Sequence, residues 1–255
     1  MYIEQIIWYF LIYAMIGYVV EVIYCSFGER KLVNRGFLYG PWLPIYGIGA
    51  LLVIGATEAV VSMPPLLFLV TVILTSVVEY IGSWALERLF GIQLWDYSSH
   101  RFNINGRVCL KNSTLFGLLG LALVYLIHPQ VKGAIALMDR PYVAIGSHLI
   151  LVALGVDTTA STLGMLSFTR LLDRYHRRKE EIERRLASLA LESHARLLIE
   201  RLHEERSELH ERLLARSRSL MARFPSASSH NEKRRTHLSE LRTRLKDALR
   251  ETGDE

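Results

Sequence analysis

Acidic side chains lie within stretches of this 255-residue sequence that are otherwise apolar. Glu21 and Glu79 each interrupt a long run of aliphatic and aromatic residues, and Glu87 follows Glu79 along the same run. A charge at the centre of a lipid bilayer costs roughly 2.5 to 3.5 kcal/mol even on the mildest scale. Some other group must therefore compensate each of these carboxylates. Glu58 and Asp157 are less informative, because each could be a neutral packing residue.

Arginines in the neighbouring polar segments are the natural partners for these carboxylates. Arg35 and Arg107 lie in two connections that flank the apolar runs, and a guanidinium group holds a carboxylate through two-pronged hydrogen bonds. We therefore expect a buried polar cluster near the cytoplasmic side, with these candidate members: Glu21, Arg35, Glu79, Glu87, Asp96, Asn103 and Arg107. Two interpretations stay open. The pairs lock loops to helices, or they bind an anionic or zwitterionic small molecule, a lipid headgroup or a proton.

Signals for catalysis and for metal binding are sparse. The segment "WDYSSHRFNINGRVCLKNS" contains Asp96, His100 and Arg101, which could serve as acid, base and anion-holding groups in phosphate or lipid chemistry. This set has no supporting motif, so we assign no catalytic residue. The nine histidines show no metal-ligand spacing, and we expect neither a metal nor another cofactor.

The elements that would position the cluster follow from the lengths of the apolar runs. Only 9 of the 30 Lys and Arg residues precede residue 169, and the apolar runs before it approach the ~20 residues that cross a bilayer core. Within the third run, Thr75, Glu79, Ser83 and Glu87 are four apart, which places them on one helical face. We predict an all-α, polytopic membrane protein with about five transmembrane helices, near 3–27, 41–62, 66–90, 113–127 and 142–168.

Basic residues set the predicted orientation, because positively charged loops stay on the cytoplasmic side. Arg35 lies in the first connection and Arg107 in the third, and the tail carries most of the remaining basic residues. We therefore predict an N-terminus outside and a C-terminus inside. This topology places Cys25 and Cys109 at the reducing face, where we expect free thiols.

The tail differs in character from the first 168 residues. We divide the chain into a transmembrane domain over 1–168, a long cytoplasmic helix over 169–224, and a linker with a short amphipathic helix over 225–255. Leu198, Leu209 and Leu220 are eleven residues apart, a repeat that keeps one apolar stripe nearly straight along a helix. The stripe could pair with a second copy in a coiled coil or with the last segment folded back, and we favour homo-oligomerisation. Acids and bases interleave along the tail, which disfavours nucleic acid as a partner.

Four blocks of the sequence carry a family resemblance. "GYVVEVIYC", "NRGFLYGPWLPIYGIGA", "EYIGSWALERLFG" and "WDYSSHRFNINGRVCL" resemble, in order and spacing, the motif blocks of the putative ABC-transporter type IV, or CmpB-like, family of bacterial integral membrane proteins. Besides the polar candidates above, the resemblance carries over a structural set: Gly17, Gly36, Gly40, Pro41, Pro44, Gly47, Trp95, Tyr97 and Gly106. It covers roughly residues 5–165, and the tail lies outside it.

The resemblance implies a component of a transporter in the bacterial cytoplasmic (inner) membrane. The sequence has no GxxxxGK[ST] loop, which an ATPase needs to hold nucleotide phosphates. We therefore expect a permease-like or accessory subunit that sits in the lipid bilayer and has a separate ATPase as its partner. Two alternatives remain: a membrane enzyme acting on a lipid or phosphorylated small molecule, and an oligomeric scaffold or sensor whose tail transmits or assembles.

Overall fold

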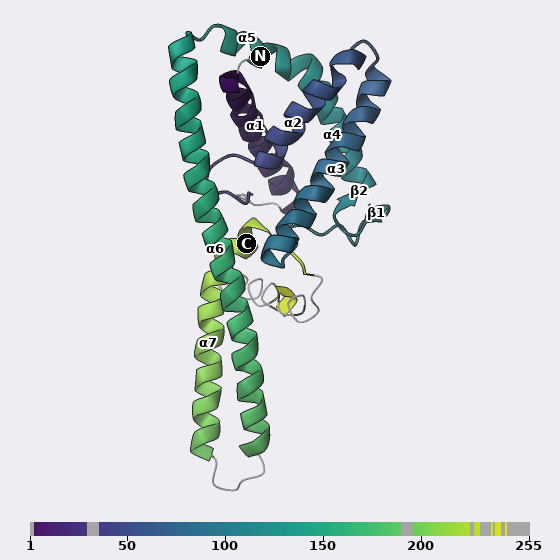
Figure 1. The fold of residues 1–255 in the computed structure, drawn as a ribbon. Coiled ribbons are helices and arrows are strands. Elements are labelled where there is room, and N and C mark those ends of the chain that lie inside the picture. The colour runs from purple at the N-terminus through teal and green to yellow at the C-terminus, as the bar shows by residue number, and fades with distance from the viewer. Residues whose placement is uncertain are drawn as a thin grey trace.

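A bundle of apolar helices stands on a long charged hairpin in the computed structural model of the chain (Figure 1). The structure describes residues 3–29, 36–189, 196–224, 227–229, 236, 238–240 and 243. Helices make up nearly all of its regular structure, which confirms the predicted all-α class.

The bundle consists of α1 (Ile3–Glu29), α2 (Pro44–Thr57), the 3-10 turn η1 (Glu58–Val60), α3 (Pro64–Phe90), α4 (Leu110–Ala122), the π-helical stretch η2 (Leu123–Ile127), α5 (His128–Ala136) and the first part of α6 (Arg140–Leu189). The helices α1, α2, α3, α4 and α6 alternate in direction along the chain, and α5 crosses the top of the bundle between α4 and α6 (Figure 1). A short antiparallel ribbon of β1 (Asn103–Ile104) and β2 (Val108–Cys109) precedes α4. The second arm of the hairpin is α7 (Arg196–Arg223).

Four helices of the described chain are long and apolar enough to cross a membrane, rather than the five predicted. They are Ile3–Phe27, Pro64–Phe90, Leu110–Ala136 and Arg140–Leu186. The predicted span over 41–62 corresponds to the shorter apolar helix Pro44–Val60. It is shorter because the chain before Pro44 is bent, and Pro44 occupies the first turn, where a missing N–H is tolerated.

The predicted span over 113–127 ends too early. α4, η2 and α5 follow one another as a 27-residue apolar helix, Leu110–Ala136, and this helix does not end at Pro129. Pro129 sits in the first turn of α5, directly after the wide turn of η2, and a π-helical turn of this kind accommodates an interruption of the regular hydrogen bonding. α5 packs on α1, where the Tyr13 hydroxyl lies 2.6 Å from Nδ1 of His128.

α1 and α2 approach closely at glycines of the recognised blocks. A methyl group at Gly17 would overlap the ring of Tyr46, and one at Gly47 would meet the ring and backbone of Phe10. Small residues allow such contact between membrane helices, where packing supplies much of the stability. This contact places Tyr46 against the half of α1 that is predicted to be cytoplasmic.

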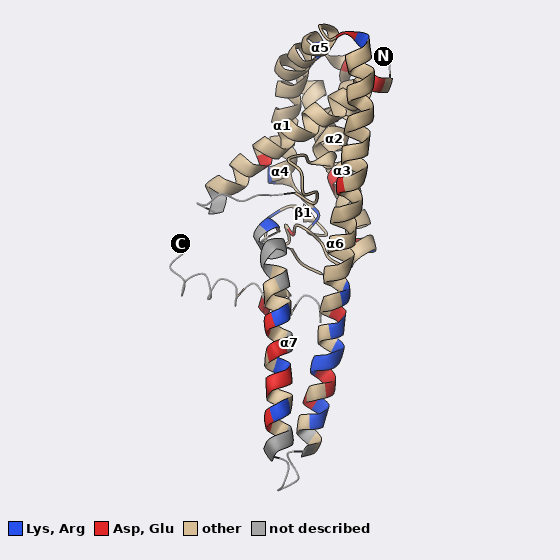
Figure 2. Ribbon diagram, turned by 90° about the vertical axis from the view of Figure 1, so that its left-hand side faces the viewer, with Lys and Arg blue, Asp and Glu red and all other residues tan. Residues whose placement is uncertain are grey.

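The tail forms a hairpin, which corrects the single helix expected over 169–224. α6 continues out of the bundle for a total of 50 residues, about 75 Å at 1.5 Å per residue, and α7 returns beside it (Figure 1). Arg178 pairs with Glu205 at 2.6 Å, and Tyr175 hydrogen-bonds to His210 at 3.0 Å, so the two arms are antiparallel. Figure 2 shows charges of both signs along these arms and few in the bundle.

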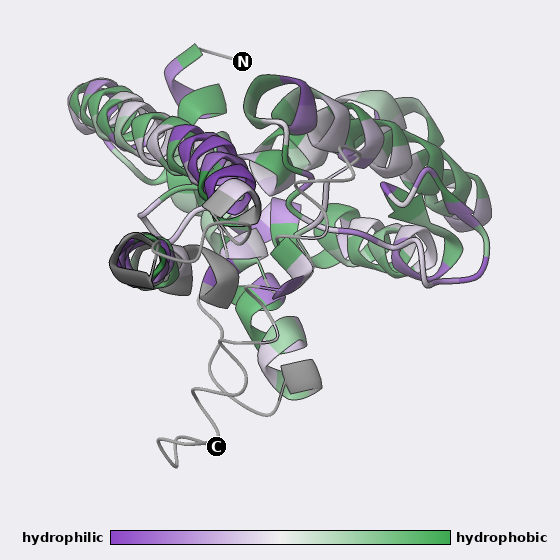
Figure 3. Cartoon of the chain, turned by 90° about the horizontal axis from the view of Figure 1, so that it is seen from below, coloured by the Kyte–Doolittle hydropathy of each residue, from purple (hydrophilic) through white to green (hydrophobic). Residues whose placement is uncertain are grey.

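The apolar stripe of the tail is at least partly covered within the chain. Leu213 lies four residues after Leu209 of the eleven-residue repeat, on the same side of the helix, and it is fully buried together with α6 residues such as Leu172. Antiparallel pairing can cover an apolar face without a second copy. Seen from the hairpin side, Figure 3 shows hydrophilic residues along the arm of α6 and hydrophobic residues over the bundle helices. The short helix predicted within 225–255 lies mostly outside the described residues.

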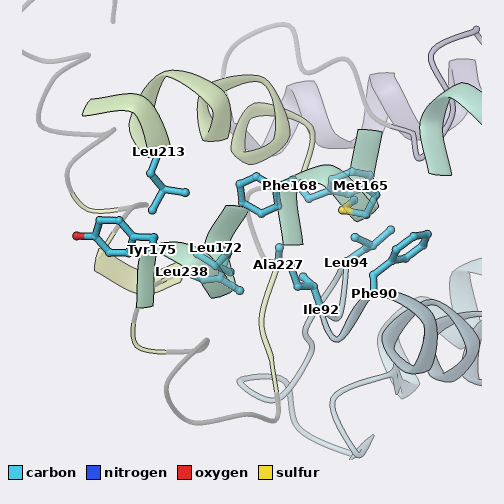
Figure 4. Close-up of a cluster of buried hydrophobic side chains, with 11 residues drawn as sticks. Phe90, Ile92, Leu94, Met165, Phe168, Leu172, Tyr175, Leu213, Ala227 and Leu238 are labelled. Carbon is cyan, nitrogen blue, oxygen red and sulfur yellow. The ribbon is translucent and has the colours of Figure 1, made fainter. Parts of the chain in front are cut away.

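An apolar cluster joins the hairpin to the bundle (Figure 4). Its buried members come from the end of α3 and the chain after it, from α6, and from α7 and the chain after it: Phe90, Ile92, Leu94, Met165, Phe168, Leu172, Tyr175, Leu213, Phe224, Ala227 and Leu238. Gln93 and Ser228 exchange two backbone hydrogen bonds of 2.8 Å, and the Ser229 hydroxyl donates to the Gly91 carbonyl. We call residues 227–229 the strap, because they tie the tail to the C-terminal end of α3.

Candidate functional site

α3 presents a polar stripe on one face and apolar side chains on another. Glu79 and Ser83 are buried, and Glu87 follows one turn further along the same face. Val77 and Ile81, by contrast, are about half exposed. An exposed apolar face suits lipid, whereas a buried polar face needs partners from the protein.

Four elements bring polar side chains together around Glu79. Tyr46 of α2 donates a 2.7 Å hydrogen bond to Oε2 of Glu21 in α1. The Tyr97 side chain, from the connection before β1, hydrogen-bonds to the Glu79 carboxyl, and Glu21 interacts electrostatically with Glu79. We call Glu21, Tyr46, Glu79 and Tyr97 the carboxylate cluster. Three helices and one connection therefore bring four residues from distant parts of the sequence into one site.

Glu79 is the least satisfied member of the carboxylate cluster. Its residue surface is only 5% exposed. Within the described chain, its Oε2 atom has no hydrogen-bond partner, and no Lys or Arg lies within ion-pair distance of it. A buried carboxylate oxygen without a donor is costly, because water no longer solvates it.

Glu87, two turns beyond Glu79, has a guanidinium partner. Nη2 of Arg107 lies 2.6 Å from Oε2 of Glu87, and the two side chains are only 9% and 14% exposed. Nη1 of Arg107 donates to the Ser83 hydroxyl at 3.4 Å, and the guanidinium carbon lies 5.5 Å from the centre of the Tyr80 ring. The pair is therefore a charge-assisted hydrogen bond held in a largely buried setting.

The connection between α3 and α4 aims Arg107 and Tyr97 at α3. Trp95 donates its indole N–H to the Arg107 carbonyl at 3.0 Å, and the Tyr97 N–H donates to the Gly106 carbonyl at 2.8 Å. Gly106 has a φ of +67°, and a side chain there would also collide with Asp96. A glycine is therefore needed at this turn.

Asp96 and Asn103 make contacts that shape this connection. Asp96 accepts a 2.8 Å hydrogen bond from the backbone N–H of Ser98. Asn103 donates to the His100 carbonyl at 2.7 Å and accepts from the Gly106 N–H at 3.0 Å. These contacts lie within the connection, so the structure does not bring Asp96 and Asn103 into the carboxylate cluster. His100 and the neighbouring Arg101 are exposed.

Asp157 has a role that the sequence reading missed. Its carboxylate accepts hydrogen bonds from the backbone N–H groups of Tyr39 and Gly40, both at 2.8 Å, from the Trp42 indole at 2.9 Å and from the Ser161 hydroxyl at 3.0 Å. Four converging donors require an acceptor, which corrects the reading of Asp157 as a neutral packing residue. The available signal was a Gly- and Pro-rich segment next to an apolar run, because its unpaired N–H groups need an acceptor in a membrane.

The remaining positions of the second motif block divide between loop and helix. Arg35 lies outside the described residues. Gly36 and Gly40 are in the bent segment, and Pro41, where the predicted span over 41–62 begins, also precedes the helix. The helix α2 begins instead at Pro44. The segment therefore enters the bundle as a loop whose backbone is satisfied by α6.

Comparison with known families gives one match. A family model described as Putative ABC-transporter type IV matches residues 8–162, more than half of the chain. The matched region contains the carboxylate cluster, Arg107 and Asp157, and it ends before the hairpin. The comparison with curated proteins returned no match, and neither did the comparison with solved structures.

Proposed function

Because the chain belongs to the Putative ABC-transporter type IV family, we propose that it is a permease-like or accessory subunit of a membrane transporter. Its four long apolar helices fit a polytopic membrane protein. The sequence contains no GxxxxGK[ST] loop to hold nucleotide phosphates, so we assign ATP hydrolysis to a separate partner chain. The family resemblance favours the bacterial cytoplasmic membrane, and basic residues in the connections and tail favour an orientation with the hairpin inside.

One observation carries the proposal: within an apolar helix long enough to span a membrane, a buried carboxylate oxygen has no hydrogen-bond partner among the described residues. A carboxylate that only holds the fold together should have donors on both oxygens, as Asp157 has. Glu79 lacks a donor on Oε2 within the described residues. Ionisable groups inside membrane proteins commonly mark pathways for ions, protons or substrates. We therefore place the ligand site of the subunit at the carboxylate cluster.

The depth of the carboxylate cluster supports this placement. Glu79 lies 11 residues before Phe90, the end of α3, which is about 16 Å at 1.5 Å per residue. It lies 15 residues, about 22 Å, after Pro64 at the other end. With the orientation proposed above, the carboxylate cluster sits within the bilayer on its cytoplasmic half, and the Glu87–Arg107 pair lies closer to the surface.

The test is mass spectrometry of the full-length protein extracted in native lipid patches. We expect an ATPase chain to co-purify at a fixed ratio, and Arg101→Gln, at an exposed position, to retain it. Recovery of this chain alone, with or without self-association, would contradict the subunit role. The same spectrum reports copy number, which tests the homo-oligomer that we inferred from the tail stripe.

A second candidate, a scaffold or sensor that acts through its tail, is favoured by the strap. The strap hydrogen-bonds to the chain directly after α3. At the end of α7, the guanidinium carbon of Arg223 lies 4.8 Å from the centre of the Tyr39 ring, and Tyr39 belongs to the loop that hydrogen-bonds to Asp157. The tail thus contacts both the chain after α3 and the loop before α2. No comparable contact favours the membrane-enzyme alternative, since Asp96 and Asn103 are engaged within their connection among the described residues.

The scaffold candidate is tested with Ser228→Pro, because proline removes the N–H that bonds to the Gln93 carbonyl. Ser228→Ala keeps that N–H and is the matched control. We expect faster hydrogen exchange at the Gln93 amide in the proline variant, together with loss of partner chains from the purified complex. If exchange accelerates and every partner remains bound, the tail contact does not transmit or assemble.

A further inference from the structure

Three carboxylates of the bundle are buried to different degrees and are compensated in different ways. Asp157 is met by four hydrogen-bond donors, and Glu87 by the guanidinium group of Arg107. Glu79 is the most deeply buried of the three and has only the Tyr97 hydroxyl as a described donor. An ionised carboxylate without a counter-charge costs several kcal/mol when it leaves water. Glu79 therefore needs something that the described side chains do not supply.

We propose that Glu79 binds a proton and that the carboxylate cluster is the proton site of this protein. A proton neutralises the buried group and needs no cavity. It also turns one carboxylate oxygen into a donor, and Glu21 provides a second carboxylate in the same cluster. The proton is thus the ligand of the site described under the proposed function, and any use of this proton in transport rests on that function.

The groups around Glu79 are consistent with a proton rather than with an anion. α1 contributes Glu21, α2 contributes the Tyr46 hydroxyl, and the connection contributes Tyr97. The guanidinium of Arg107 is engaged by Ser83, one turn away, and by Glu87, two turns away. A second carboxylate disfavours an anionic ligand by repulsion and disfavours ionisation of Glu79 in the same way.

The other elements packed on α3 direct their ionisable groups elsewhere. From α4, Lys111 is exposed, and the buried Ser113 accepts a 2.8 Å hydrogen bond from Ser76 of α3. From α6, Asp157 faces the donors of the loop before α2. Neither helix therefore offers a described cation to Glu79, and proton binding is the remaining way to remove its charge without a ligand.

The experiment uses dicyclohexylcarbodiimide, an apolar reagent, on the full-length protein in native lipid patches. A protonated carboxyl adds across one C=N bond of the reagent: its oxygen bonds to carbon and its proton moves to nitrogen. Rearrangement to the N-acylurea retains the whole reagent mass, which peptide mass spectrometry locates. We expect label on Glu79 at neutral pH, falling roughly tenfold for each pH unit once Glu79 ionises. Glu87, paired with Arg107, should remain unlabelled and is an internal control.

A second measurement does not depend on access of the reagent. The infrared spectrum of the wild-type protein minus that of Glu79→Gln should contain a protonated carboxyl C=O band at neutral pH. Glu58→Gln removes an exposed carboxylate of the same bundle and is the matched control. Finding only ionised carboxylate bands for Glu79 would overturn the proposal, whatever the labelling shows.

Sodium distinguishes a proton from a metal cation. If Na⁺ suppresses labelling of Glu79 at constant pH and choline does not, the site holds a metal ion and the proton assignment is wrong. Unchanged labelling in Na⁺ supports the proton. The outcomes also separate the two proposals: an ionised Glu79 in a complex with an ATPase refutes only the proton, whereas a protonated Glu79 in a solitary chain refutes only the subunit role.

Discussion

Replacing Arg107 tests how far the bundle depends on its buried ion pair. Arg107→Gln removes the guanidinium 2.6 Å from Glu87, while both side chains are less than 15% exposed. Removing one partner of a fully buried pair costs about 3 to 5 kcal/mol. Because the Glu87 side chain is 14% exposed, some water can reach it, and we expect a loss just below that range, about 2 to 3 kcal/mol.

The double variant separates the ion pair from the other contacts of Arg107. Arg107→Gln also loses the 3.4 Å bond to Ser83 and the approach to the Tyr80 ring, whereas Arg107→Gln with Glu87→Gln leaves no buried charge from the pair. We expect the double variant to be more stable than the sum of the two single losses predicts, by about 1 to 2 kcal/mol. That difference is the coupling energy of the pair.

The assay is reversible unfolding of the full-length protein in mixed micelles, with sodium dodecyl sulfate as denaturant and tryptophan fluorescence as the signal. Arg101→Gln, in the same connection but exposed, should change the free energy of unfolding by less than about 0.5 kcal/mol. A loss for Arg107→Gln no larger than that for Arg101→Gln, or single losses that add without coupling, would show that the ion pair does not stabilise the bundle.

Two further predictions concern the loop before α2 and the hairpin. Asp157→Asn replaces one acceptor oxygen by an NH₂ group that faces other donors, so we expect a loss of about 2 to 3 kcal/mol and a shifted Trp42 fluorescence, with exposed Asp139→Asn as control. Equal stability of the two variants would show that the loop does not depend on Asp157. For the hairpin, cysteines are introduced as Arg178→Cys and Glu205→Cys in a chain whose Cys25 and Cys109 are replaced by Ala. We expect a short bis-maleimide to join the two new cysteines within one chain, because Nη2 of Arg178 lies 2.6 Å from Oε1 of Glu205. A cross-linked dimer on a denaturing gel would instead favour pairing between copies.

Local periodicity made the apolar helices and the α3 stripe predictable. A helix repeats every 3.6 residues whatever surrounds it, so the spacing of Glu79, Ser83 and Glu87 placed them on one face before any tertiary contact was known. The residues that this face meets belong to other elements, and spacing could not select among them. Arg107 and Asp96 were both predicted members of the polar cluster, but of these two only Arg107 contacts α3 in the described structure.

The sequence by itself indicated that this protein has helices suited to a lipid bilayer, that it is helical and which family it resembles. Run length, periodicity and motif blocks are all properties of short segments. Tertiary structure decided which groups compensate the buried charges and where the described part of the tail packs. Asp157 meets Tyr39 across 118 positions of sequence, and Ser228 meets Gln93 across 135, so neither contact has a local signal. The antiparallel packing of α7 on α6 likewise depends on pairing between distant faces, because an apolar stripe must be covered but does not itself select the surface that covers it.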